Sequence, residues 1–456
     1  MKAQDPVALL ASAAAMTRWT QLPQAVQSQA IDLVCDTLAV IAAGTTHHSH
    51  QRIAAIMHSK GLCTRLDTAQ PADLLNAAFI NAAATTVWQL QDGHRMAKGH
   101  PASHLVPALW ALAEASGAGG EAFLSAFVAG YETGARIGLA LGGLQPLIHD
   151  VGTWSSIGTA AGAAHLLSNG NADVIQRAIN ACASLVPTFD NETVTQGASV
   201  HHLAIGIAAQ NAVIAAQSAV ARLTTLPDTL GRYFAPRVGV NFDLAQLKDG
   251  ISSDARWSKF ELLNAYFKVH PTCAHLHGLN DAVDWILSEH KPNAADIEGV
   301  RIDLYQAALR YDVDTPTCDL SMRFSARATA AFALINMGLN WQTFTFEQVE
   351  TPAVQSMMQR IHVHHDTALN SFYPEGRPAT VTVQMRDGQT FKKRVIKPLG
   401  DCTNPMSRAQ KRAKAQSLFK ARYGQYAAEI MCQVERLESD AALGILSGLL
   451  RMPGRP

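Results

Sequence analysis

Histidines are the residues of this sequence with the most evident capacity for chemistry, because there are 18 of them and most are grouped. The groups are His47, His48 and His50; His94, His100 and His104; His201 and His202; His270, His275 and His277; and His362, His364 and His365. A metal site needs such residues at a ligand spacing. His100 and His104 could share a helix face, but Pro101 marks His100 as the residue before a helix, and no glutamate follows as in the H-E-x-x-H motif. We therefore expect no metal site.

Asp92 and His100-Pro101 mark a predicted helix start that would favour anions. Proline at the first helical position fixes φ near about −65° and lacks only a hydrogen that a helix start leaves unpaired. The free N–H groups there attract carboxylates. His149 and Gly152-Thr153 precede an alanine-rich helix in a similar way. The alternative at both places is an ordinary helix cap next to a histidine.

Lys268 follows an apolar, aromatic stretch that includes Leu262, Tyr266 and Phe267. In such surroundings the pKa of a lysine can fall toward neutrality, so that its amine becomes a general base. The alternative is a solvated lysine that ends a helix.

The elements that position these residues are helical over the first part of the chain. Within 121–139, apolar residues recur at the spacing of one helix face, and the segment 158–164 consists almost entirely of glycine and alanine. Small residues allow helices to approach closely. The pattern predicts a mainly α protein whose large all-helical domain covers residues 1–265.

Strand patterns begin only after residue 268. Val300, Ile302 and Leu304 alternate with charged residues, and residues 361–364 suggest a second strand. A third strand around 381–385 turns at Asp387-Gly388 into a fourth at 391–396, which is typical of a hairpin. We therefore predict a smaller α+β domain over residues 266–406, and a helical segment over 407–456 that completes the first domain.

The composition excludes several classes of partner. Lys and Arg number 37 and Asp and Glu also number 37, so no overall field would hold nucleic acid. No apolar run approaches the ~18–20 residues that cross a bilayer, so we expect no membrane partner. Seven cysteines without a C-x-x-C pair indicate a reducing, cytoplasmic setting. Only 16% of residues are charged and 48% are hydrophobic, which favours a homodimer that covers apolar surface.

Taken in order, these segments resemble the MmgE/PrpD family, which includes 2-methylcitrate dehydratase, cis-aconitate decarboxylase and iminodisuccinate epimerase. The segments that carry the resemblance are 22–44, Asp92 with His100-Pro101-Ala102-Ser103, Gly130-Tyr131-Glu132, His149 through Thr153, 158–167, Lys268 through His277, Phe324-Ser325, and Pro398 through Pro405. The resemblance implies a helical domain and an α+β domain, a cleft between them, a homodimer and no cofactor. It also implies that the substrate is a small polycarboxylate.

The chain departs from the family pattern at three places. Dehydratases and decarboxylases usually carry two adjacent acids and a threonine where this chain has Gln91-Asp92-Gly93. They carry a lysine where it has Ser199-Val200-His201, and an aromatic residue where it has Arg327-Ala328-Thr329. An epimerase needs one group that removes a proton and a second that returns it on the opposite face, whereas a dehydratase needs a general acid for the departing hydroxide.

The resemblance and the departures together favour a cofactor-independent epimerase of a polycarboxylate such as iminodisuccinate. A dehydratase or decarboxylase of a citrate-like acid is the alternative, and a non-catalytic binding protein on the same scaffold is a third. The expected catalytic residues are Lys268, His100, His149, His201 and Asp92. The expected substrate-binding residues are His94, Thr153, Ser199, His277, Arg323 and Ser325.

Overall fold

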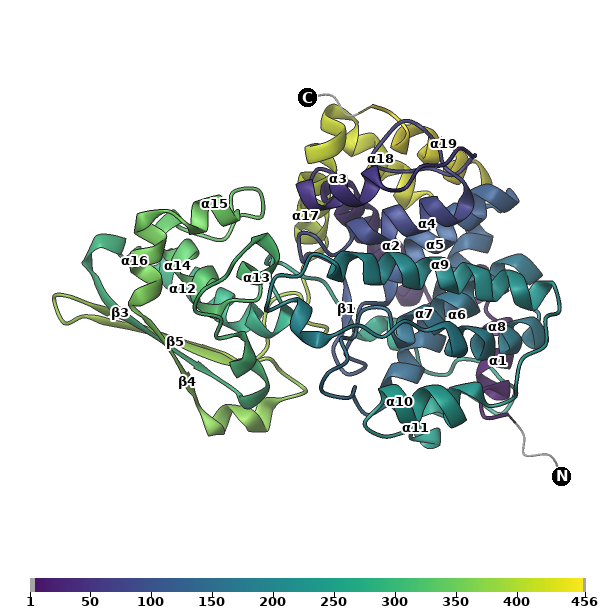
Figure 1. The fold of residues 1–456 in the computed structure, drawn as a ribbon, viewed down its shortest axis with the longest axis horizontal. Helices are drawn as coiled ribbons and strands as arrows, with labels where there is room; N and C mark the ends of the chain where they lie inside the picture. The colour runs from purple at the N-terminus through teal and green to yellow at the C-terminus, as the bar shows by residue number, and fades with distance from the viewer. Residues whose placement is uncertain (1–4, 454–456) are drawn as a thin grey trace.

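Two large hydrophobic cores organise the chain in the computed structural model, which describes residues 5–453. The first core draws its side chains from residues 7–267 and 406–450, and the second draws them mainly from residues 273–385. Figure 1 shows the corresponding large helical unit beside a smaller unit that contains a sheet. This confirms the fold class expected from the sequence.

The helical unit contains the first eleven α-helices and the last three. They are α1 (Ala8–Ala15), α2 (Gln24–Gly44), α3 (His48–Ala55), α4 (Leu74–Ala84), α5 (Pro101–Ser116), α6 (Gly120–Ala140), α7 (Trp154–Ser168), α8 (Ala172–Leu185), α9 (His201–Val220), α10 (Ala235–Val238), α11 (Leu244–Lys248), α17 (Arg408–Tyr423), α18 (Ala427–Glu435) and α19 (Asp440–Leu450). Helix α17 packs against α2, so the end of the chain returns to its beginning (Figure 1).

Glycines allow α6 and α7 to pack backbone against backbone. A Cβ atom on Gly158 of α7 would lie 2.7 Å from the carbonyl oxygen of Gly130 and 2.7 Å from Cα of Gly134, both in α6. No larger residue fits at this distance without a shift of one helix. The close approach that the small residues of 158–164 predict is therefore present.

The α+β unit is a four-stranded sheet covered by helices. Its strands are β3 (Ile297–Leu304), β4 (Ile361–His365), β5 (Ala379–Met385) and β6 (Thr390–Val395), in the order β4-β3-β5-β6. Its helices are α12 (His277–His290), α13 (Asp319–Met322), α14 (Ala326–Asn336), α15 (Phe346–Val349) and α16 (Pro352–Gln359). Strands β3 and β4 are parallel, and the other pairs, including the predicted β5–β6 hairpin, are antiparallel.

Two helices correct the expectation that no apolar run reaches membrane-spanning length. Helices α2 and α9 are long and apolar enough to cross a bilayer. However, 61% of the apolar window in α2 and 56% of that in α9 is buried inside the protein. Both helices contact several neighbours in the helical unit, as core helices do.

A short ladder joins the segments that carry the predicted site. Strand β1 (Gly93–His94) pairs antiparallel with β2 (Ala265–Tyr266), and Gly93 lies opposite Tyr266. A Cβ atom on Gly93 would lie 2.2 Å from the Tyr266 ring, so only glycine allows this pairing. The ladder therefore fixes the loop that leads to His100 beside the segment that leads to Lys268.

Candidate active site

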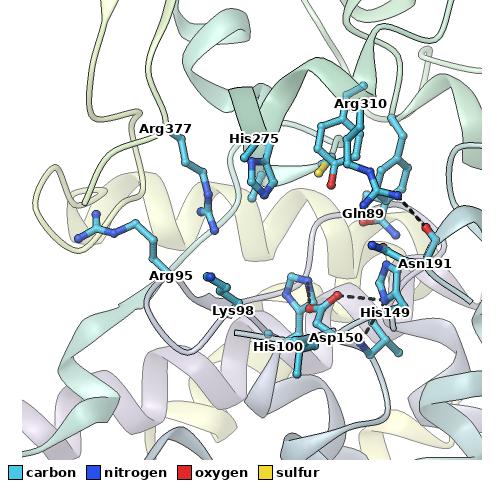
Figure 2. A pocket seen from close by; sticks show the side chains of 18 of the residues that line it. Gln89, Arg95, Lys98, His100, His149, Asp150, Asn191, His275, Arg310 and Arg377 are labelled. Carbon is cyan, nitrogen blue, oxygen red and sulfur yellow. Dashed lines mark hydrogen bonds and ion pairs between the residues drawn. The ribbon is translucent and has the colours of Figure 1, made fainter. Parts of the chain in front are cut away.

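A cavity of about 340 Å³ lies where the two units meet. The helical unit contributes Gln89, Lys98, His100, His149 and His201 to its wall. The α+β unit contributes His275, Arg310 and Arg377. Figure 2 shows His100, Asp150 and His149 on one side of the cavity and His275 on the opposite side.

Positive charge dominates the cavity wall. Its formal cations are Arg95, Lys98, Lys268, Arg310 and Arg377, and its acid is Asp150. The charge of Arg95 is balanced by Asp401, which is not among the residues that line the cavity. Nη1 of Arg95 lies 2.6 Å from both carboxylate oxygens of Asp401. The remaining excess of cations in a confined space favours a ligand with more than one negative charge.

Lys268 is 1% exposed and its ammonium group has a neutral partner. Its Nζ donates to Oε1 of Gln89 at 3.2 Å. The Gln89 amide is itself oriented, because its Nε2 donates to the carbonyl oxygen of Thr86 at 2.8 Å. Burial lowers the pKa of Lys268 to about 8. About a tenth of this side chain is thus the free amine at pH 7, far more than for an ordinary lysine, and the alternative of a solvated lysine is wrong.

His100 presents one ring nitrogen to the cavity. Its Nδ1 donates to the backbone carbonyl oxygen of Asp92, so Nε2 faces Oδ2 of Asp150 at 3.5 Å. Burial lowers the pKa of His100 to about 4, with Lys268 adding to this effect. The imidazole is therefore neutral near pH 7, and Nε2 can accept a proton.

His149 and Asp150 lie side by side next to His100. Nδ1 of His149 lies 3.1 Å from the Val151 backbone N–H and 3.0 Å from Oδ1 of Asp150. It accepts from Val151 when unprotonated and donates to Asp150 when protonated, since one nitrogen cannot do both. Burial would raise the pKa of Asp150, but His149 and His100 hold it well below its usual range. Asp150 is thus an ionised carboxylate that stabilises a proton on either histidine.

His104 joins the segments that carry His100 and His149 through hydrogen bonds of its ring. Its Nδ1 donates to the carbonyl oxygen of His100 at 2.8 Å, and its Nε2 accepts from the Gly152 N–H at 3.0 Å. This arrangement requires the neutral ring, and burial lowers the pKa of His104 to about 4. His104 therefore ties the first turn of α5 to the loop that carries His149 and Asp150.

His201 and His275 face the cavity from the two units. His201 is 1% exposed, and neither of its ring nitrogens has a hydrogen-bond partner among the described residues. Burial, followed by the neighbouring His149 and His202, lowers its pKa well below the usual value. His275 makes a hydrogen bond through Nδ1 to the Tyr305 hydroxyl, and burial with Arg377 and Arg310 lowers its pKa to about 3. Both rings are therefore neutral near pH 7.

The structure places Asp92 behind the cavity wall rather than on it. Its carboxylate is fully buried and accepts the backbone N–H groups of Ala102 and Ser103, with the Ser103 hydroxyl as a third donor. Burial raises its pKa to about 7 against the opposing effect of these donors. Asp92 thus caps α5 through its side chain and orients His100 through its carbonyl oxygen.

The six expected substrate-binding residues are also outside the set that lines this cavity. His94 faces Glu261, Thr153 donates to the Asp150 carbonyl, Ser199 lines another pocket, His277 packs edge-to-face against His270, Arg323 donates to two backbone carbonyls, and Ser325 caps α14. Most of these polar side chains satisfy groups of the protein itself. In this chain, these motif positions therefore serve mainly to stabilise local structure.

Several residues that line the cavity were not expected from the sequence. They are Gln89, Lys98, Asp150, His275, Arg310 and Arg377. The sequence contains an indication for two of them, because Asp150 follows His149 and His275 belongs to a histidine group. The arginines stand in segments without a motif, so only the fold shows that they face the same space.

One group of three potential metal ligands occurs among the described residues. Nε2 of His47 and Nε2 of His48 lie 3.6 Å and 3.8 Å from Oδ2 of Asp319. Nδ1 of His47 accepts the Ser49 N–H, so the proton of the neutral ring is on Nε2 and points at Asp319. A metal would need the lone pair of that same nitrogen. The hydrogen bonding therefore favours a histidine–aspartate contact over metal coordination.

Comparison with known proteins gives matches over most of the chain. The model of the MmgE/PrpD N-terminal domain matches residues 8–231, and that of the MmgE/PrpD C-terminal domain matches residues 270–438. The chain is also similar to the cis-aconitate decarboxylase-like protein oryM of Aspergillus oryzae. The two are 24% identical over 356 residues, which cover 73% of this chain and 72% of the relative.

Proposed function

Because the chain belongs to the MmgE/PrpD family, we propose that it is an enzyme that moves a proton at a carbon next to a carboxylate of a small polycarboxylate. Within that class we propose a cofactor-independent epimerase, acting on a compound such as iminodisuccinate. The cytoplasm is its proposed location, since all seven cysteines are free thiols.

The observation that carries this proposal is the pair of Lys268 and His201 in one cation-lined cavity. Among the described residues, Lys268 has no carboxylate partner, and His201 has no partner on either ring nitrogen. Removal of a proton next to a carboxylate produces an enolate-like charge, which the surrounding cations stabilise in a confined site. Unprotonated His201 takes the proton from one face of the carbon while the ammonium of Lys268 gives a proton to the opposite face, and the other stereoisomer reacts in reverse, from the Lys268 amine to protonated His201.

The shortage of carboxylic acid in the cavity favours the epimerase over a dehydratase. Departure of hydroxide requires a general acid. The wall supplies the amides of Gln89 and Gln91, while the carboxyl group of Asp92 points into the start of α5. The one acid that lines the cavity, Asp150, is held in its ionised form by two histidines. An epimerase needs no leaving-group acid, since protons only move between carbon and protein.

The relative named as a cis-aconitate decarboxylase-like protein supports a second candidate. In a decarboxylation, carbon dioxide leaves and the same cations stabilise the resulting carbanion, which one protonated group then quenches. This reaction also needs no acid for hydroxide. A decarboxylase of a citrate-like acid is therefore the alternative function.

Proton NMR in deuterated water with a panel of di- and tricarboxylates tests both candidates. The epimerase would replace one hydrogen next to a carboxylate by deuterium and scramble the configuration, with no loss of water or carbon dioxide. A new alkene signal or release of carbon dioxide would select the lyase. Binding without any reaction across the panel would favour a binding protein and contradict the proposal.

A further inference from the structure

Arg377 carries a buried guanidinium that none of the groups in residues 5–453 satisfies. The residue is 7% exposed, and its Nε has no hydrogen-bond partner. Its side chain makes no hydrogen bond or ion pair with the described residues. Its remaining contact is a stacking interaction, with Cζ 4.7 Å from the centre of the Tyr266 ring.

The other deeply buried arginines of the described chain differ from Arg377 in this respect. Arg136 pairs with Glu132, Arg95 pairs with Asp401, and Arg323 donates to the carbonyl oxygens of Pro271 and Phe344. A buried charge is costly unless it is paired and hydrogen-bonded. The protein meets this requirement at these three arginines, including Arg95 on the cavity wall, and leaves it unmet at Arg377.

No acid of the protein is free to approach Arg377 from within the cavity. Asp150 lies between two histidines, and Asp401 is taken by Arg95. The neighbouring Tyr266, Tyr305 and Cys273 are neutral, because burial raises the pKa of each above its usual value. The missing partner must therefore come from outside the chain.

The cavity holds unpaired cations at two separate places. Figure 2 shows Arg377 near Lys98 on one side and Arg310 beside Asn191 on the other. Lys98 has no ion pair among the described residues, and its backbone is held in a left-handed turn with φ of 56°. Arg310 is an exposed residue whose one hydrogen bond within the described part of the chain goes to the carbonyl oxygen of Asn191, at 3.3 Å, so it can also bind a group that enters from solvent. One negative group cannot satisfy both places.

We propose that Arg377, together with Lys98, forms a subsite that binds one terminal carboxylate of the substrate, while Arg310 holds a carboxylate at the other end. The inference rests on the proposed function and adds which ends of the substrate are recognised. Arg377 thus determines specificity for a compound with carboxylates at both ends. Guanidinium binds carboxylate through two parallel hydrogen bonds, which Lys cannot reproduce.

The backbone holds Arg377 rigidly for this role. Its N–H donates to the carbonyl oxygen of Ile396 at 3.1 Å, just before β5 begins. A Cβ atom on Gly278 of α12 would lie 2.3 Å from the Arg377 carbonyl oxygen, so the chain is pressed against this helix. The guanidinium is therefore presented from the α+β unit at a fixed place.

The test uses Arg377→Met and Arg377→Lys, with Arg422→Met as the matched control. Arg422 lies in α17 and donates to the carbonyl oxygens of Leu66 and Asp67, outside the cavity. Without ligand, we expect Arg377→Met to melt at or above the wild-type temperature, because an unpaired buried charge is removed. Arg422→Met should melt lower, because buried carbonyl groups lose their donors.

Citrate, succinate and succinamate are the probes for binding, measured by calorimetry and by the shift in melting temperature. Wild type and Arg422→Met should bind the diacid succinate more tightly than its monoamide. Arg377→Met should bind succinate about 10- to 100-fold more weakly, as expected for loss of a charge-assisted pair, and lose the preference for the diacid. Arg377→Lys should recover only part of the affinity.

The proposal is overturned if Arg377→Met binds the diacids like wild type, if it melts as low as Arg422→Met, or if wild type binds none of the three probes. These outcomes differ from failure of the proposed function. Diacid binding that depends on Arg377, without deuterium exchange in any polycarboxylate, would leave the subsite correct and the epimerase wrong.

Discussion

The ammonium group of Lys268 donates to the amide oxygen of Gln89 and has no carboxylate as a hydrogen-bond partner. Burial is the main cause of its lowered pKa, because a charged amine loses its hydration in the cavity wall. The wall beside Lys268 carries the side chains of Gln89 and Gln91. Because the amides of Gln89 and Gln91 carry no charge, they do not stabilise the ammonium form of Lys268 as a carboxylate would. Its amine can therefore act as a base.

Replacement of Lys268 should lower catalytic activity without destabilising the fold. We expect Lys268→Met to lower kcat by at least the ~10²-fold typical of one acid–base group, while the melting temperature stays the same or rises, because a buried charge is lost. Lys268→Arg should not restore activity, since guanidinium keeps its proton near pH 7. Steady-state kinetics and thermal melting check both, and near-normal turnover in either variant would contradict the assignment.

The pH dependence follows from the pKa of about 8 at Lys268. A base must be unprotonated, so for the stereoisomer from which Lys268 removes the proton kcat/KM should rise with pH and level off above pH of about 8. Gln89→Glu places a carboxylate at hydrogen-bond distance from Nζ of Lys268. This favours the ammonium form and should shift the rise in kcat/KM to higher pH. Gln145→Glu adds a charge to the same wall without a hydrogen bond to Lys268, and serves as the control. Equal profiles for wild type and Gln89→Glu would show that Lys268 is not the titrating base.

At the scale of elements, three helix starts deliver the histidines. His100 precedes α5, His149 lies in the loop before α7, and His201 opens α9. Helix α7 is placed by its glycine contact with α6, and His104 links its leading loop to α5. The position of the site thus depends on packing that lies outside the cavity.

Gly158→Ala tests this dependence. The added Cβ would meet the backbone of α6 at 2.7 Å, so we expect a lower melting temperature, by about 1–3 kcal/mol of stability, and reduced activity as the start of α7 shifts. Gly444→Ala in α19 is the control, because no atom lies within 4 Å of its added Cβ. It should be neutral or stabilise by up to ~1 kcal/mol through helix propensity. Equal melting temperatures for the two variants would contradict the packing argument.

The sequence predicts the helix starts and strands because their signals are local. Pro101, the small residues of 158–164 and the alternation of 300–304 each act over a few positions. Hydroxyl residues such as Thr153 and Ser325 were expected to bind substrate, yet they make local turn and cap hydrogen bonds. Such residues serve caps and turns as readily as ligands, and the sequence alone does not distinguish the two uses.

At the scale of the whole molecule, the cavity exists only because two units meet. Arg310, His275 and Arg377 come from segments more than a hundred residues after His100 and His149. No periodicity marks which loop residue will face a space formed by such distant segments, so these residues could not be predicted. A substrate with charges at both ends would bridge the two units.

The surface of the helical unit supports the prediction of a homodimer. Exposed apolar side chains occur from the end of α8 through the segment that follows α9, at Leu185, Ile214, Val220, Leu223 and Leu226. We expect a second copy to cover apolar surface of this kind, in an interface of more than ~2,000 Å² in total, as in obligate dimers. Sedimentation velocity at micromolar concentration should give a dimer, and a monomer would contradict this prediction.

In the proposed mechanism, Lys268 and His201 serve opposite faces of the carbon next to a carboxylate. The most direct test follows each stereoisomer of the reactive polycarboxylate separately by proton NMR in deuterated water, with wild type, Lys268→Met and His201→Asn. Wild type should exchange and invert both stereoisomers. His201→Asn should exchange the hydrogen of one stereoisomer without inverting it and leave the other unreacted, and Lys268→Met should show the reverse. Inversion of both stereoisomers by either folded variant at a rate near that of wild type would contradict the account.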